Sequence, residues 1–215
     1  GFRLKFDTQI GAFATTLDPF GDSSCVALYQ FEDNTNDTSG NFNGSNNGVT
    51  FTETSPFGVG KAGVFDSNDY ITTSTSNYGV FNTTAYSISV WVKWSTSTYG
   101  DRLIFSNDSS NTNFQHLAWQ VNAGGISFRD RAAGMGGSDL SFAQTPVEGR
   151  WYHIGVTRSG ANFVLYLDGS RVATDTGNTN TNDDGNFVIG SSPEYVALDV
   201  SLLLFLMLSL YRYTF

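Results

Sequence analysis

The chain has 215 residues, a formal net charge of −9 and only 14% charged residues. Gly (23), Phe (18) and Tyr (10) are abundant, whereas the helix formers Lys and Glu occur only three and four times. This composition favours strands joined by tight turns over helices. The excess of acidic residues excludes nucleic acid as a partner, because counterion release requires clustered Lys and Arg.

Short strands separated by turn signals follow one another along the chain. Residues 1–20 are expected to be a connector or the end of a preceding segment, because the turn sequence Asp18–Gly21 comes before the first strand. Since the chain begins with Gly1, we also expect it to be part of a longer protein. The expected strands are Val26–Phe31, Val49–Thr52, Gly63–Phe65, Tyr70–Thr73, Tyr86–Trp94, Arg102–Ser106, His116–Val121, Ile126–Arg129, Trp151–Thr157, Asn162–Leu167, Arg171–Thr174 and Phe187–Gly190.

The segment Tyr86–Trp94 has the clearest strand pattern of the chain. Its even-numbered residues are apolar, and they alternate with Ser87, Ser89, Trp91 and Lys93, which predicts one core face and one largely polar face. Arg158–Ala161 and Asp168–Gly169 predict hairpin turns, the second because Asp-Gly favours two successive positive φ angles. Many short strands at this spacing predict an all-β, two-sheet antiparallel sandwich of the jelly-roll kind.

Four sequence blocks, in order, resemble the concanavalin A-like, laminin-G-like domains. The blocks are Leu28–Glu32 with Asp37–Asn41, Gly63–Ile71, Ser87–Val92, and Trp151–Val156 followed by Leu165–Gly169. The resemblance implies a jelly-roll domain over residues 21–200. It also implies a role in binding glycans or proteins, as part of a secreted, cell-surface or virion-surface protein.

The same resemblance implies a calcium site. In the family, an acidic residue after the first strand and the Asp of the closing strand share the ion, and the matching residues here are Glu32 and Asp199, with Asn36 and Asp37 in the adjoining loop. Such a site suits Ca²⁺, which prefers oxygen ligands from separate loops. Alternatively, Asp37 belongs to a turn in which its side chain accepts backbone N–H groups.

Catalytic motifs are missing from the sequence. Retaining glucanases of this fold carry two carboxylates on one strand, and none of the four Glu has a partner at that spacing. His116 and His153 are too far apart in sequence to suggest a metal site, and we expect His153 to face solvent or to be hydrogen-bonded. The chain is therefore interpreted as a non-enzymatic binding module, with a glycoside hydrolase as the less favoured alternative.

A glycan site would use aromatic rings and hydrogen-bonding side chains. Tyr99, Trp119 and Arg129 are the candidates, because they lie on or near the middle strands, although most rings in so aromatic a chain belong to the core. A structural decoration domain of a particle surface, without glycan specificity, is the alternative function.

The C-terminal segment 201–215 departs from the family pattern. Its apolar stretch Leu202–Leu208 is seven residues long, and a membrane-spanning helix needs about 17–25. A closing strand buried on both faces would fit, but we expect instead that the native strand ends near Val200 and that the remainder is foreign to the fold. On that expectation, the tail packs poorly or forms a stray helix, and its deletion leaves the melting temperature unchanged.

Overall fold

The computed structural model describes residues 24–38, 40–52, 55–66, 69–73, 81, 85–94, 101–110, 113–120, 125–131, 137–177, 185–190, 200–202 and 206–209. Sixteen strands and no helix occur in these ranges. They are β1 (Cys25–Tyr29), β2 (Gly44–Asn47), β3 (Thr50–Thr52), β4 (Ala62–Phe65), β5 (Tyr70–Thr73), β6 (Ala85–Lys93), β7 (Asp101–Ser110), β8 (Asn113–Gln120), β9 (Gly125–Arg131), β10 (Gly137–Ala143), β11 (Trp151–Ser159), β12 (Asn162–Leu167), β13 (Ser170–Thr176), β14 (Asn186–Ile189), β15 (Val200–Leu202) and β16 (Leu206–Ser209). Within these described ranges nothing could serve as a membrane-spanning helix.

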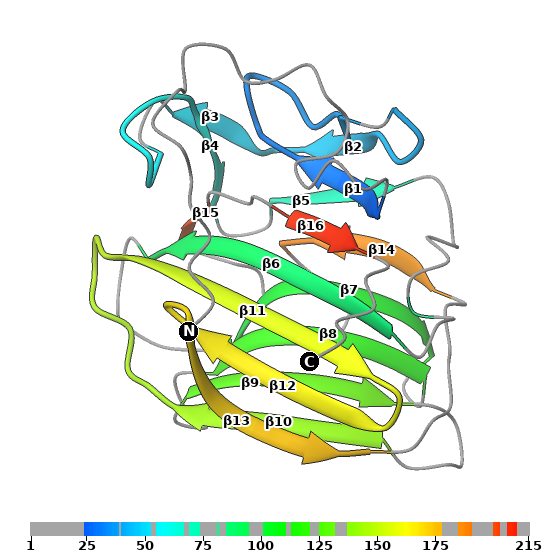
Figure 1. Cartoon of the computed structure of the whole chain (residues 1–215). Coiled ribbons are helices and arrows are strands. Elements are labelled where there is room, and N and C mark those ends of the chain that lie inside the picture. Colours follow the sequence, from blue (N-terminus) through cyan, green and yellow to red (C-terminus); the bar gives the residue numbers. More distant parts are fainter. Residues whose placement is uncertain are drawn as a thin grey trace.

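The strands form two large antiparallel sheets, which lie face to face as two layers (Figure 1). The six-stranded sheet has the order β1-β16-β6-β11-β12-β13, and the seven-stranded sheet has the order β10-β9-β8-β7-β14-β5-β2. A third, three-stranded sheet has the order β15-β4-β3. The predicted two-sheet antiparallel jelly-roll sandwich is therefore confirmed.

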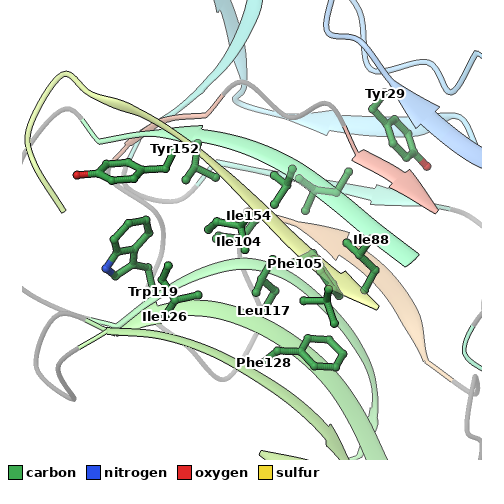
Figure 2. Close-up of a cluster of buried hydrophobic side chains, with 14 of the residues drawn as sticks. Tyr29, Ile88, Ile104, Phe105, Leu117, Trp119, Ile126, Phe128, Tyr152 and Ile154 are labelled. Atoms are coloured by element: carbon green, nitrogen blue, oxygen red, sulfur yellow. The ribbon is translucent and has the colours of Figure 1, made fainter. Parts of the chain in front are cut away.

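Apolar residues that alternate along the strands fill the space between the two large sheets (Figure 2). On β6 the predicted alternation is confirmed, because Ile88, Val90 and Val92 are buried while the intervening residues are half-buried. The rings of Trp119 and Tyr152 meet edge to face across the core, with 4.9 Å between their centroids. Such a core supplies the main stabilisation of a sandwich.

The two predicted hairpin turns are present. β11 and β12 pair up to Ser159 and Asn162, which leaves Gly160 and Ala161 as the connecting residues. Asp168 (φ 49°) and Gly169 (φ 77°) both have positive φ, the geometry that favours the Asp-Gly sequence between β12 and β13.

Residues 200–202 and 206–209 form strands, in contrast to the expected foreign tail. β15 pairs with β4, and β16 lies between β1 and β6 in the six-stranded sheet. Residues 206–209 are therefore part of the six-stranded sheet. The expected connector 1–20 lies outside the described residues.

Candidate functional site

The outer face of the six-stranded sheet carries large aromatic residues where polar ones are usual. β6 and β11 pair in a register that sets Lys93 opposite Trp151 and Trp91 opposite His153. All four share the strand face that points away from the core, and all four are half-buried. The register therefore gathers two Trp, one His and one Lys at the same end of two central strands.

These four residues and Phe57 make a continuous surface, which we call the aromatic patch. The rings of Phe57 and Trp91 meet edge to face at 5.6 Å between centroids, and the Trp91 and His153 rings are 5.0 Å apart. Lys93 Nζ lies 5.0 Å from the centroid of the Trp151 ring. An aromatic surface edged by a cation can hold the apolar face of a ligand and one of its polar groups.

His153 is fixed within the aromatic patch by hydrogen bonds. Its Nε2 lies 2.8 Å from Ser89 Oγ, and its backbone N–H donates to Asp168 Oδ1 at 3.0 Å. Burial lowers the pKa of His153, with Asp168 acting in the opposite direction. Because the pKa falls from an ordinary value of 6.5, the imidazole is neutral at pH 7. The expectation that this His is hydrogen-bonded is confirmed.

The Ser89–His153 pair has the spacing of a nucleophile and its base, but its surroundings do not suit acyl transfer. Acyl transfer needs N–H donors aimed at the developing oxyanion. Ser89 is paired with Gly155 of β11 on one side and Met207 of β16 on the other, so its neighbouring N–H groups belong to the sheet ladder. The pair therefore positions an imidazole on the surface.

Trp119 and Arg129, two of the residues predicted to bind a glycan, lie on opposite faces of one sheet. Trp119 is fully buried, and its indole N–H donates to the Gln144 carbonyl at 2.8 Å. This corrects its expected role, because a ring enclosed by the core cannot stack on a surface sugar. Arg129 lies on the opposite face of the same sheet, where its Nε is 3.8 Å from Asp139 Oδ1. Tyr99 lies outside the described residues.

The alternation of side chains distinguishes the aromatic patch from the core. Trp119 lies on the buried face of its strand, together with Leu117. Trp91 lies on the outward face of β6, together with Ser87 and Ser89. Trp91 was not among the residues expected to bind a glycan, although its place in this alternation is visible in the sequence. An outward-facing Trp among serines was the signal that could have found the patch.

Two carboxylates of the predicted calcium site, Asp37 and Glu32, accept backbone hydrogen bonds. Asp37 is 2% exposed, and its two carboxylate oxygens accept the backbone N–H groups of Leu28 (2.7 Å) and Phe42 (3.3 Å). Glu32 Oε1 accepts the backbone N–H of Lys61 at 3.1 Å. These contacts support the turn interpretation for Asp37.

The other two residues of that site give no further ligand geometry. Asn36 is exposed, and its backbone N–H donates to Asn34 Oδ1. Asp199 lies outside the described residues. In the part of the chain that the structure describes, no group of three or more His, Cys, Asp or Glu is placed to hold a metal ion. Calcium binding stays a prediction.

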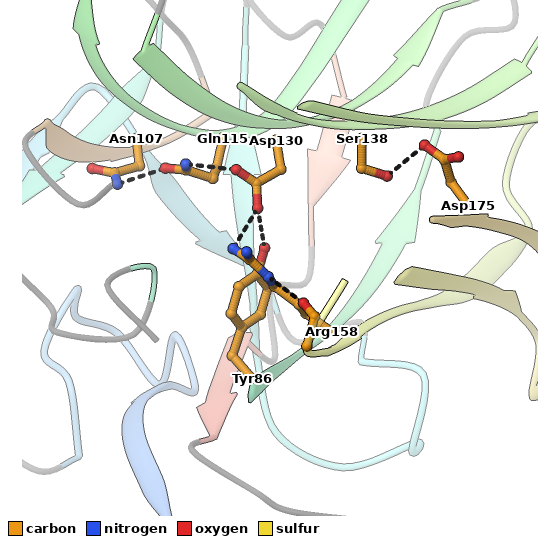
Figure 3. Close-up of polar contacts among 8 residues, drawn as sticks. Tyr86, Asn107, Gln115, Asp130, Ser138, Arg158 and Asp175 are labelled. Carbon is orange, nitrogen blue, oxygen red and sulfur yellow. Dashed lines mark hydrogen bonds and ion pairs between the residues drawn. The ribbon is translucent and has the colours of Figure 1, made fainter. Parts of the chain in front are cut away.

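A buried polar network joins the two large sheets at one end of the core (Figure 3). Asp130 Oδ2 accepts hydrogen bonds from Tyr86 Oη (3.0 Å) and Arg158 Nη1 (3.1 Å), and its Oδ1 accepts one from Gln115 Nε2 (3.0 Å). The side chains of Arg158 and Asp130 are 1% and 7% exposed. Arg158 also lies over the Phe163 ring, at 4.9 Å from its centroid.

The electrostatics of this network follow from its burial. Loss of solvent raises the pKa of Asp130, and the hydrogen bond from Gln115, the charge of Arg158 and the bond from Tyr86 act in the opposite direction. Burial and the nearby carboxylate also raise the pKa of the Tyr86 hydroxyl. Because the network is enclosed between the sheets, its role is to position them, and we do not count it among the ligand contacts.

Comparison with known proteins identifies the fold family. Residues 65–201 match the family described as the Concanavalin A-like lectin/glucanases superfamily. Among curated proteins, no sequence match to the chain is found.

Solved structures share the fold at low sequence identity. Domain 4 of AbnA, an extracellular GH43 arabinanase from Geobacillus stearothermophilus in complex with arabinotriose, is 17% identical, with a TM-score of 0.72 over 89% of this chain and 94% of that one. The binding domain of botulinum neurotoxin DC in complex with SialylT is 14% identical (TM-score 0.65), with 89% of this chain and 49% of that chain covered. Domains LG4-5 of the mouse laminin alpha1 chain are 15% identical (TM-score 0.51; 68% and 38% covered).

The family match covers more than half of the chain, and its sandwich is the fold described above. The chain belongs to the concanavalin A-like lectin/glucanases superfamily.

Proposed function

We propose that this protein is a non-catalytic, lectin-like module that binds glycans through the aromatic patch. The observation that carries the proposal is the pair of half-buried Trp rings, Trp91 and Trp151, on the solvent side of two central strands. Large aromatic rings normally contribute to stability by full burial in the core. Rings held at the surface by a sheet are instead available to a ligand.

The chemistry of the aromatic patch suits a sugar ring. The C–H face of a pyranose or furanose is apolar and packs on an indole, while its hydroxyl groups require hydrogen-bonding partners at the rim. Ser89 and the neutral His153 lie beside Trp91 and provide such polar atoms. Because the rings sit on paired strands rather than on loops, little ordering of the protein is needed on binding.

The structural neighbours support a binding module. One was solved with arabinotriose and another with SialylT. A further neighbour, also a botulinum neurotoxin DC binding domain, was solved with rat synaptotagmin II, which is a protein ligand. The first neighbour comes from an extracellular enzyme, and we propose an extracellular, cell-surface or virion-surface location for this chain as well.

We propose a non-catalytic protein on the basis of its sequence. None of the four Glu has a second carboxylate at the strand spacing that retaining glucanases of this fold use. We therefore expect the protein to bind a glycan without cleaving it.

A glycan array tests the proposal, with the wild-type protein and the variants W91A, W151A and R129Q. We expect wild-type binding to at least one glycan class, a loss of about tenfold or more in each Trp variant, and no change in R129Q. R129Q is the control, since Arg129 lies on the other large sheet. Circular dichroism and urea unfolding of each variant check that the fold is retained.

Two results would overturn the proposal. Wild-type protein that binds no glycan on the array, with or without Ca²⁺, would favour a structural decoration domain. Binding that survives W91A and W151A but is lost in R129Q would place the site on the seven-stranded sheet.

A further inference from the structure

Lys93 is the cation of the aromatic patch, and it has no carboxylate partner among the described residues. Its ammonium group lies 5.0 Å from the centre of the Trp151 ring. Lys61, in contrast, forms an ion pair with Asp33 at 2.7 Å. The chain has 20 acidic and 11 basic residues.

The other charges near the aromatic patch cancel. Arg150 Nη2 pairs with Asp168 Oδ2 at 2.7 Å, and both side chains are at least one-third exposed. His153 is neutral at pH 7 because burial lowers its pKa. Among the described residues of the patch, Lys93 is therefore a cation without a carboxylate neighbour, and its position beside an indole lets it contact a group on a sugar stacked there.

We propose that the aromatic patch selects glycans that carry a carboxylate, such as uronic or sialic acid residues, and that the carboxylate pairs with Lys93. This inference rests on the proposed glycan-binding function. The sugar ring packs on the indole rings, and the carboxylate pairs with the ammonium group of Lys93. The overall negative charge of the chain opposes the approach of an anion, so binding of an acidic sugar depends on the local contact with Lys93.

Matched pairs of acidic and neutral sugars test this inference. Titration calorimetry compares sialyllactose with lactose, and tetragalacturonate with its methyl ester, on wild-type protein, K93Q and K61Q. K61Q is the matched control, because it changes the net charge equally but alters a Lys that already has a carboxylate partner. Vesicles of phosphatidylserine and phosphatidylcholine, assayed by co-sedimentation, form the last arm.

The expected result is tighter binding of at least one acidic sugar than of its neutral partner, by roughly threefold to tenfold. K93Q should abolish that preference, while K61Q keeps it, and added salt should reduce it. Equal binding of acidic and neutral sugars, with both lost in W91A, would overturn the role of Lys93 and leave the glycan-binding proposal intact. If no sugar binds, the proposed function itself fails. Binding to anionic vesicles alone would assign the surface to lipid headgroups and overturn both.

Discussion

Replacing Arg158 by Met should destabilise the protein strongly at neutral pH. The Arg158 side chain is 1% exposed, and it is hydrogen-bonded to Asp130 at 3.1 Å and to the Gly160 carbonyl at 3.2 Å. Met has a similar length and keeps the apolar contact with Phe163, so the main loss is electrostatic. Leaving the Asp130 carboxylate buried without its cation should cost about 3–5 kcal/mol of the free energy of unfolding.

The size of this loss should depend on pH. Burial already places the pKa of Asp130 above its ordinary value of 3.8, and removal of Arg158 takes away an interaction that lowers it. When the folded-state pKa of a carboxyl group is raised, the group contributes fully to stability at a pH below its unfolded-state pKa. That contribution is lost as the pH rises through the folded-state pKa. The R158M deficit should therefore be small near pH 4 and complete at pH 7.

Urea unfolding followed by tryptophan fluorescence at both pH values measures the deficit. R131M is the matched control, because Arg131 pairs with Asp139 at the surface (side chains 37% and 51% exposed), and it should lose no more than about 1 kcal/mol. The double variant R158M/D130N should recover more than half of the loss, since a neutral amide can bond to both Gln115 and Tyr86. A loss below about 1 kcal/mol in R158M at pH 7, or a loss independent of pH, would refute the reasoning.

Four further outcomes are expected. The D37A variant should lose about 1–3 kcal/mol of unfolding free energy, because two backbone N–H groups lose their acceptor; denaturation that matches wild type would contradict this. Calcium bound through Glu32 and Asp199 should raise stability by roughly 2–3 kcal/mol at a hundredfold excess over Kd, and equal melting temperatures in CaCl₂ and EDTA would exclude the site. Deleting residues 202–215 removes β16 from between β1 and β6 and should lower Tm by about 5 °C or more, whereas an unchanged Tm would show that the tail is dispensable. Purified protein should release no reducing sugar from laminarin, and steady release would disprove the absence of a catalytic carboxylate pair.

Local sequence patterns predicted most of the central strands and their faces. The alternation in β6 and the Asp-Gly turn after β12 are set by neighbouring residues, so they can be recognised without tertiary information. β2 and β10 were not predicted. The β2 sequence, GSNN, contains no apolar residue and pairs with β5 through its backbone, so hydrophobic periodicity gives no signal there.

Contacts between distant segments could not be predicted in the same way. β16 pairs with strands far away in sequence, and its uninterrupted apolar run fits either a covered strand or a foreign tail. Arg158 lies on the face of β11 that otherwise carries apolar residues, which indicates a buried cation. The neighbouring sequence does not identify Asp130 as its partner. The aromatic patch depends on the register between β6 and β11, which sets Trp91 beside His153.

The four tryptophans allow one measurement that tests the central proposal directly. Trp91 and Trp151 lie on the aromatic patch, whereas Trp94 and Trp119 are at most 1% exposed in the core. In ¹⁵N-labelled protein each indole N–H gives its own NMR signal, which can be assigned by single Trp-to-Phe replacement. On titration with the glycan that binds best, the Trp91 and Trp151 signals should shift with one saturation curve, while those of Trp94 and Trp119 stay in place. Saturable binding that leaves the Trp91 and Trp151 signals unmoved would contradict the aromatic patch as the glycan site.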